Sequence, residues 1–199
     1  MNLKTLLAGC VMAAAVALPA SAHEETFVAV LTGAAEIPPN ASPGTGTALI
    51  TVDLDTLMMD VQITFAALLG TTTAAHIHCC TLAPGAANVG VATMLPSFTG
   101  FPLAVTSGTY DHVFDMALAS SYNAAFVTAK GGISNAFTAL IAGMETGNAY
   151  LNLHTSQFPG GEIRGLLHTA PVPEPETYAL MGAGLLLTGC AARRRRSAA

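Results

Sequence analysis

The sequence contains no tryptophan, and aromatic residues make up only 6% of its 199 residues. Charged residues are also scarce, at 10% of the total. Between residues 23 and 170 the only cationic side chains are Lys130 and Arg164, against ten aspartates and glutamates. Because phosphate binding depends mainly on lysine and arginine, this composition argues against a nucleic-acid partner.

Three catalytic signatures are missing as well. The chain has no Gly-x-Ser-x-Gly elbow, no P-loop and no dinucleotide-binding glycine fingerprint. Their absence argues against a hydrolase, an NTPase or a dehydrogenase that uses these motifs.

Cysteine is almost absent from the central part of the chain. Two of the four cysteines, Cys10 and Cys190, lie in apolar segments near the ends, which leaves Cys79 and Cys80 as an adjacent pair. In an oxidising compartment such a pair can close a vicinal disulfide, stay reduced or ligate a metal. We favour a disulfide between Cys79 and Cys80.

The N-terminal residues have the pattern of a secretory signal peptide. Lys4 supplies the positive charge, residues 6–18 form an apolar run, and Ala20, Ser21 and Ala22 form a small-residue cleavage site. We therefore expect residues 1–22 to be removed by signal peptidase during export across the inner membrane.

The C-terminal segment combines a short motif, an apolar run and a basic tail. The apolar run covers residues 178–192 and is followed by four arginines, 193–196. As a helix the run spans roughly 22 Å, less than the ~30 Å of a bilayer core. The arginines favour a cytoplasmic C-terminus, with the rest of the chain outside. The motif consists of Val172, Pro173, Glu174 and Pro175.

Residues 171–199 thus resemble the PEP-CTERM sorting signal of Gram-negative bacteria. The resemblance implies that an exosortase processes the chain after the helix at 178–192 has anchored it transiently in the membrane. It also implies a final location at the cell surface or in the extracellular matrix. An ordinary tail anchor is the alternative, although such an anchor does not need the Val-Pro-Glu-Pro motif.

The remaining residues, 23–170, suffice for one domain with a full hydrophobic core. Several short segments alternate apolar and polar residues with the period of two that is typical of half-buried strands. Helices are expected at 122–130, with Ser121 as the N-cap, and at 133–143. The expected strands are 26–32, 48–54, 59–65, 74–78, 110–116, 149–154 and 162–168.

Seven or eight antiparallel strands with one or two short helices predict an all-β fold. The strand pattern favours an immunoglobulin-like or Greek-key β-sandwich.

Four phrases in this domain resemble the CHRD domain, which is named for chordin and is widespread in exported bacterial proteins. They are LTGAAEIPP at 31–39, TAAHIH at 73–78, AYLNLHT at 149–155 and FPGGEIRG at 158–165. The resemblance covers about residues 26–168 and implies a β-sandwich like that of immunoglobulins or superoxide dismutase. Many members of the family continue the His-x-His with Gly-Pro, whereas this chain continues it with the two cysteines.

The histidines of these phrases are the best candidates for chemistry. Residues two apart on a strand point to the same face, so His76 and His78 present two imidazoles side by side. Asn152 and His154 do the same on their own strand. If the two strands are neighbours, His76, His78 and His154 form a three-nitrogen site for Cu or Zn.

A structural role is the alternative for these histidines. In that interpretation they form hydrogen bonds to backbone groups of the long loop at 82–102 and determine its course.

Glu162 and Arg164 lie two residues apart on the last expected strand. We expect them to form a structural ion pair that holds this strand in place. Glu162 is also a candidate for a fourth ligand or a supporting group at the metal site.

These observations predict an exported CHRD-domain protein that acts as a non-enzymatic binding or structural module. Exopolysaccharide is a candidate partner of such a module. The alternative is a copper- or zinc-binding redox or superoxide-handling protein that uses His76, His78 and His154.

Overall fold

The computed structural model describes residues 23–171 and residue 182. The expected signal peptide at 1–22, the Val-Pro-Glu-Pro motif and the expected membrane helix at 178–192 therefore lie outside the described residues, apart from residue 182. In the part that is described, no helix has the length and apolar character needed to cross a membrane.

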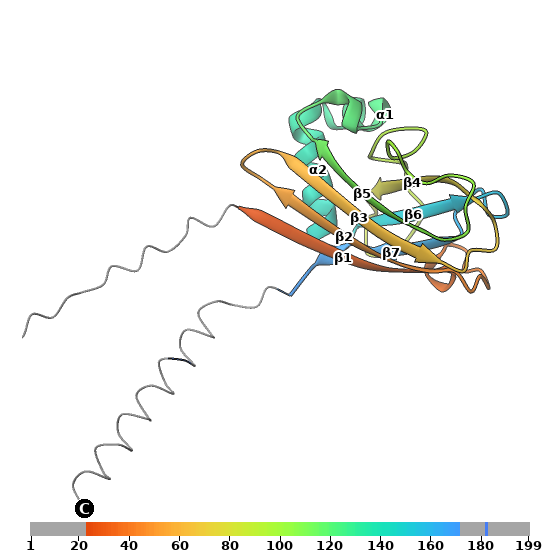
Figure 1. Cartoon of the computed structure of the whole chain (residues 1–199). Helices are drawn as coiled ribbons and strands as arrows, with labels where there is room; N and C mark the ends of the chain where they lie inside the picture. Colours follow the sequence, from red (N-terminus) through yellow and green to blue (C-terminus); the bar gives the residue numbers. More distant parts are fainter. Residues whose placement is uncertain (1–22, 172–181, 183–199) are drawn as a thin grey trace, which may run out of the picture.

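The described chain is an all-β domain with two short α-helices, as predicted (Figure 1). Every strand pair is antiparallel, and the sheet order is β4-β6-β7-β1-β2-β3-β5, with β8 also paired to β1. The elements are β1 (Glu24–Thr32), η1 (Gly33–Ala35), β2 (Thr45–Asp53), β3 (Met58–Ala66), β4 (Thr72–Cys79), β5 (Gly108–Asp115), η2 (Ala119–Ser121), α1 (Ala124–Lys130), α2 (Ile133–Glu145), β6 (Ala149–Thr155), β7 (Ile163–Leu166) and β8 (His168–Thr169).

The strands form one continuous sheet that curls around a common core, with α1 and α2 at one end (Figure 1). In β3 the inward side chains alternate with exposed or half-buried ones, as the sequence pattern predicted. The apolar side chains that point inward from β1, β2 and β3 pack in the same core as those of β4, β6 and α2. A curled sheet thus encloses its core in the manner of a sandwich.

Local hydrogen bonds determine the turn between β2 and β3 and the start of α1. Asp53 closes the β2–β3 turn, because its carboxylate accepts hydrogen bonds from the backbone N–H groups of Asp55 and Thr56, each at 2.9 Å. The predicted N-cap of α1 was wrong. Asn123 caps the helix by accepting from Ala125 N, whereas the hydroxyl of Ser121 donates to the carbonyl of Asp115.

The long segment between β4 and β5 covers the free edge of β4. Its backbone forms hydrogen bonds with that strand: Cys79 N donates to Gly90 O, Ala92 N to Ile77 O, Phe98 N to Ala75 O and Ala104 N to Thr72 O. As a result both faces of β4 are buried from Ala75 to Cys79, where the alternating pattern predicted one polar face. This cover encloses the histidines.

Candidate metal site

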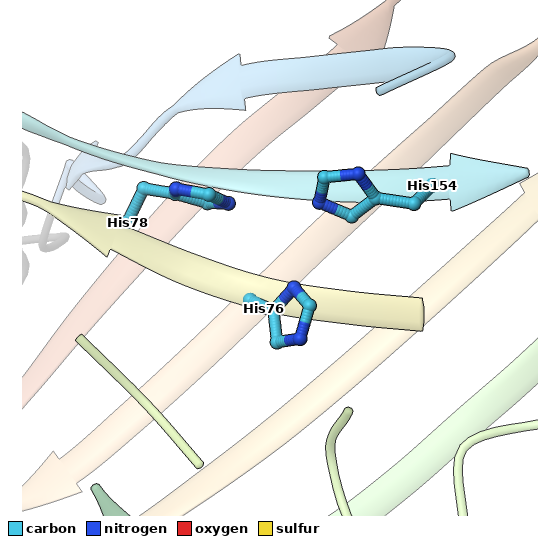
Figure 2. Close-up of side chains that lie close together, drawn as sticks. All are labelled: His76, His78 and His154. Atoms are coloured by element: carbon cyan, nitrogen blue, oxygen red, sulfur yellow. The ribbon is translucent and has the colours of Figure 1, made fainter. Parts of the chain in front are cut away.

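The pairing of β4 with β6 brings the predicted histidines together. The strands are in antiparallel register with Ala74 opposite His154, His76 opposite Asn152 and His78 opposite Tyr150. Directly opposed residues share a sheet face, so all three histidines lie on one face and on neighbouring or diagonal positions. Figure 2 shows their rings turned toward one another.

Each histidine uses one ring nitrogen to bind a backbone carbonyl. His76 Nε2 lies 2.6 Å from Pro96 O, His78 Nδ1 lies 2.8 Å from Val89 O, and His154 Nδ1 lies 2.9 Å from Pro159 O. A carbonyl oxygen only accepts, so each of these nitrogens carries the hydrogen in the neutral ring. The tautomer of every imidazole follows, and the lone pair is left on the other nitrogen.

Those other nitrogens are buried, and no group in the described part of the chain forms a hydrogen bond with them. They are His76 Nδ1, His78 Nε2 and His154 Nε2. Leaving a buried acceptor unsatisfied costs about 1–3 kcal/mol, so three such atoms in one place need an explanation.

The three rings are close enough to share one ligand. A ring nitrogen from each lies within 4.8 Å of one from both others, and the ring centroids are 5.3–5.9 Å apart. Metal-binding histidines characteristically donate their second N–H to a carbonyl or carboxylate, as all three do here. The cluster therefore has the donor set and the outer hydrogen bonds of a three-histidine metal site.

Burial keeps these imidazoles neutral. It lowers the pKa of His76 and of His78 from 6.5 to about 4, and it also lowers the pKa of His154. The positive charge of Arg164 adds to the lowering at His78 and His154. A neutral imidazole is the form that ligates a metal.

The lowered pKa values predict that the metal-free protein loses stability in acid. Between about pH 6.5 and pH 4 the unfolded chain takes up protons at His76 and His78 while the folded protein does not, so the free energy of unfolding falls as the pH falls. Each histidine contributes up to about 1.4 kcal/mol per pH unit. Denaturant titrations in chelator at several pH values measure this slope.

A variant with His76→Gln and His78→Gln should show a shallower slope than the parent over the same range. Equal slopes in the double variant and the parent would contradict the prediction.

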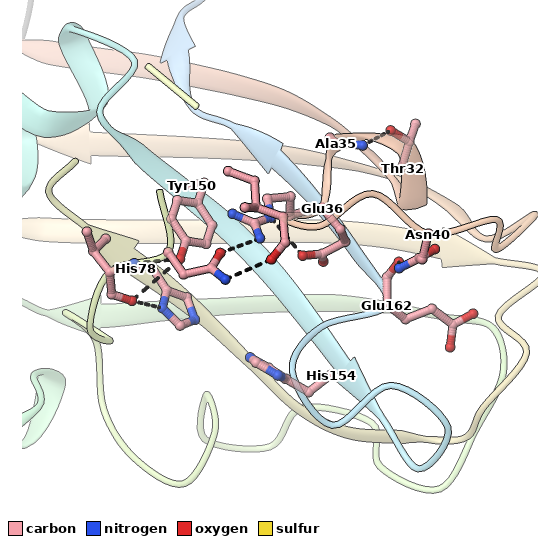
Figure 3. Close-up of polar contacts among 12 residues, drawn as sticks. Thr32, Ala35, Glu36, Asn40, His78, Tyr150, His154 and Glu162 are labelled. Carbon is pink, nitrogen blue, oxygen red and sulfur yellow. Dashed lines mark hydrogen bonds and ion pairs between the residues drawn. The ribbon is translucent and has the colours of Figure 1, made fainter. Parts of the chain in front are cut away.

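A series of buried side chains, Tyr150, Arg164 and Glu36, packs next to the histidine cluster. The ring of His78 stacks on Tyr150, with centroids 4.8 Å apart and planes 5° from parallel (Figure 3). The guanidinium of Arg164 lies 4.6 Å from the centroid of Tyr150. Arg164 Nε in turn donates to Glu36 Oε2 at 2.7 Å, and Arg164 Nη2 donates to Asn88 Oδ1.

The predicted ion pair between Glu162 and Arg164 was therefore wrong. The carboxylate of Glu162 instead accepts hydrogen bonds from the hydroxyls of Ser42 and Thr155 and from the backbone N–H groups of Leu69 and Gly70. Burial would raise the pKa of Glu162, but these four donors hold it below its usual value. These hydrogen bonds stabilise the negative charge of Glu162 without a cation. They also connect the start of β7 to the segments that contain Ser42, Leu69 with Gly70, and Thr155.

Glu162 also stays outside the histidine cluster. Within residues 23–171 the cluster contains neither a carboxylate nor a cysteine. Cys79 and Cys80 are joined to each other in a vicinal disulfide whose sulfurs lie against the carbonyl of Ala139 in α2.

Sequence reasoning missed Glu36, Tyr150 and Asn88. Glu36 and Tyr150 lie inside phrases that carry the CHRD resemblance, which was the available signal for them. Nothing in the pattern indicated that Glu36, rather than the nearer Glu162, pairs with Arg164 across 128 positions of the chain.

The side chains of Asn152 and Glu36 pack closely against the backbone of Gly161, which leads to a prediction. Its φ is +129°, and an added Cβ would lie 2.5 Å from Asn152 Oδ1 and 2.7 Å from Glu36 Oε1. Gly161→Ala should lower the free energy of unfolding by about 1–3 kcal/mol from the backbone alone, and by more through the clash. Gly160→Ala is the control, because nothing lies within 4 Å of its added Cβ. Similar denaturation midpoints for the two variants would refute the assignment.

The fold and the site define an antiparallel all-β domain with a buried histidine cluster, followed by a tail with the features of a sorting signal. The CHRD domain model matches residues 27–167, and the model of the PEP-CTERM protein-sorting motif matches residues 171–196. The chain belongs to the CHRD-domain family. Comparisons with curated proteins and with solved structures find no match.

The second match confirms the predicted sorting signal. A PEP-CTERM motif marks a protein of Gram-negative bacteria that is exported, processed by an exosortase and sorted to the cell surface or beyond.

Proposed function

We propose that this protein acts at the cell surface as a non-enzymatic binding module whose ligand is a copper or zinc ion held by His76, His78 and His154. The observation that carries the proposal is a cluster of three imidazoles whose second ring nitrogens are buried and have no hydrogen-bond partner among the described residues. A metal ion would satisfy all three at once. Imidazole nitrogen is a good ligand for both copper and zinc.

The surrounding contacts suit such a site. The carbonyls of Pro96, Val89 and Pro159 hold the rings in the tautomer that directs a lone pair into the cluster. The carbonyls of Pro96 and Val89 belong to the segment between β4 and β5, so one set of hydrogen bonds both orients ligands and fixes this segment. The structural and the metal-binding interpretations of the histidines are thus compatible.

A copper- or zinc-dependent redox or superoxide-handling activity is the second candidate. Three protein ligands leave a coordination position for water or substrate, as in catalytic metal sites. A superoxide-dismutation assay on metal-loaded protein separates the two proposals, because a binding module binds the ion without turnover.

The test of the main proposal is metal titration of the exported protein after chelation. We expect one equivalent of Cu²⁺ or Zn²⁺ to bind, and the paramagnetic resonance spectrum of the copper form to show coupling to nitrogen ligands. Binding with no nitrogen coupling, or no binding at all, would rule out the three-histidine site.

We further propose the processing steps that the two ends of the chain indicate. Signal peptidase removes residues 1–22, and an exosortase removes the segment that contains 178–192 after the domain at 23–170 has been exported. Mass spectrometry of protein from the cell surface should therefore show a new N-terminus at His23 and a C-terminus near Pro175. Surface protein that retains residues 193–196 would contradict the second step.

A further inference from the structure

We propose that removal of the signal peptide creates a second metal site, in which His23 at the new N-terminus and the carboxylate of Asp55 bind Cu²⁺. The site rests on the cleavage after Ala22 that is proposed above. It does not depend on the histidine cluster, which contains neither of these two residues.

Cleavage after Ala22 turns the first residue of the domain into a chelating group. The backbone nitrogen of His23 becomes a free α-amino group, and only the short side chain separates it from Nδ1 of the same residue. A free α-amino group has a pKa of about 8, so it can offer a lone pair to a metal near neutral pH. Imidazole nitrogen is a good copper ligand. One copper ion can therefore bind both nitrogens of a single residue in a small chelate ring.

The structure places a carboxylate beside this residue. His23 Nδ1 lies 3.5 Å from Asp55 Oδ1. A backbone hydrogen bond supports the contact, because Leu54 N donates to His23 O at 3.0 Å. Asp55 belongs to the β2–β3 turn, where its own N–H donates to Asp53 Oδ1. The first residue of the domain is thus joined to a hydrogen-bonded turn that presents an oxygen ligand.

The charges at this end of the sheet favour a cation. Glu24 follows His23 and lies opposite Asp53 in the pairing of β1 with β2, so their side chains share a sheet face. With Asp55, three carboxyl groups belong to the residues around His23, and a divalent cation offsets their mutual repulsion. Two nitrogens and an oxygen are a donor set typical of Cu²⁺, which binds such ligands more tightly than Ni²⁺ or Zn²⁺ does.

The new site and the histidine cluster lie at opposite ends of β1. A row of paired residues crosses the sheet from the last residue of β1 to the cluster: Thr32, Arg164, Asn152 and His76. His23 precedes the first residue of β1. At about 3.3 Å per residue, the nine residues of β1 separate the two sites by roughly 25 Å. The proposal therefore adds a second equivalent of Cu²⁺ to the one expected at the cluster.

Nuclear magnetic resonance of the exported, ¹⁵N-labelled protein tests the proposal, after mass spectrometry has identified its N-terminus. The probe is Cu²⁺ alone, because a paramagnetic ion broadens the amide signals near it. We expect Cu²⁺ to broaden the signals of residues 24–25 and 53–56. Copper at the histidine cluster broadens a different set, residues 76–78 and 152–154. The two sets are read independently, so failure of one proposed site is distinguishable from failure of the other.

Three variants locate the site. His23→Ala removes the imidazole, and a Ser-Gly-Ser-Gly insertion between Ala22 and His23 moves the α-amino group away from it. Both changes should abolish the broadening at residues 53–56. Asp55→Asn should weaken binding at this site about tenfold. The side chains of His23 and Asp55 are 81% and 63% exposed, so these variants should fold. His168→Ala removes an exposed imidazole elsewhere and is the control, which should respond as the parent does.

Four results would overturn the proposal. They are an exported chain that does not begin at His23, the absence of broadening at residues 53–56 in the parent, broadening there that persists in the insertion variant, and unchanged affinity in Asp55→Asn. Persistent broadening in the insertion variant would mean that copper binds without the α-amino group, as at an ordinary surface pair of imidazole and carboxylate.

Discussion

Copper or zinc should raise the melting temperature of the metal-free protein, and a variant with His76→Ala and His78→Ala should lose that rise. At a free metal concentration one hundred times the dissociation constant, the ion adds about 2.7 kcal/mol to the free energy of unfolding. For a domain of this size that corresponds to roughly 5–10 °C. Calorimetry with and without chelator measures the difference.

The same variant should also be less stable than the parent without metal. Pro96 O and Val89 O each lose the imidazole donor, although the Tyr150 hydroxyl still donates to Val89 O. Because both lost hydrogen bonds are only partly buried, we expect each to cost about 1 kcal/mol. Removing the two unpartnered ring nitrogens offsets part of this loss. His168→Ala, which changes an exposed histidine outside the cluster, should behave as the parent in both respects. If metal still raised the melting temperature of the double variant by the full amount, the ion would bind elsewhere.

Removal of the guanidinium of Arg164 should destabilise the protein by about 3–5 kcal/mol. Glu36 and Arg164 have side chains that are only 4% and 3% exposed, so Arg164→Met leaves a carboxylate buried without its counter-charge. The substitution also removes the donor to Asn88 and the cation above Tyr150. Denaturant titration at neutral pH measures the loss.

Two further variants distinguish the contribution of the ion pair to stability from that of side-chain packing. Adding Glu36→Gln to Arg164→Met should recover part of the stability, because the buried charge is then gone. Lys130→Met is the matched control, since Lys130 is the other cation of residues 23–170 and lies at the end of α1 in contact with the ring of Phe126. It should cost less than about 1 kcal/mol. Equal losses for Arg164→Met and Lys130→Met would contradict the assigned role.

Much of the fold was predictable, because the strands are short and their burial is one-sided. In β2 and β3 the period of two follows directly from which side chains face the core, and the structure confirms it. The pattern was less informative for β4, since a covering segment buries both of its faces. Alternation shows which residues share a face, but it does not show what lies above that face.

The candidate site was predictable to a similar extent. The spacing of His76 and His78 placed both on one face because side chains alternate along a strand. Their distance from His154 depended on the pairing of β4 with β6, which joins positions more than 70 residues apart. Contacts at such separation leave no local trace in a single sequence.

The sequence by itself determined the strand periods, the sorting signal and the residues available for chemistry, since each depends on neighbours along the chain. Only the tertiary structure decided how those residues combine. It paired Arg164 with Glu36 rather than with Glu162, and it gathered three imidazoles whose second ring nitrogens are buried without partners among the described residues. The physical reason is that burial creates these partnerships: a charge or lone pair removed from water must find its partner in space, wherever that partner lies in the chain.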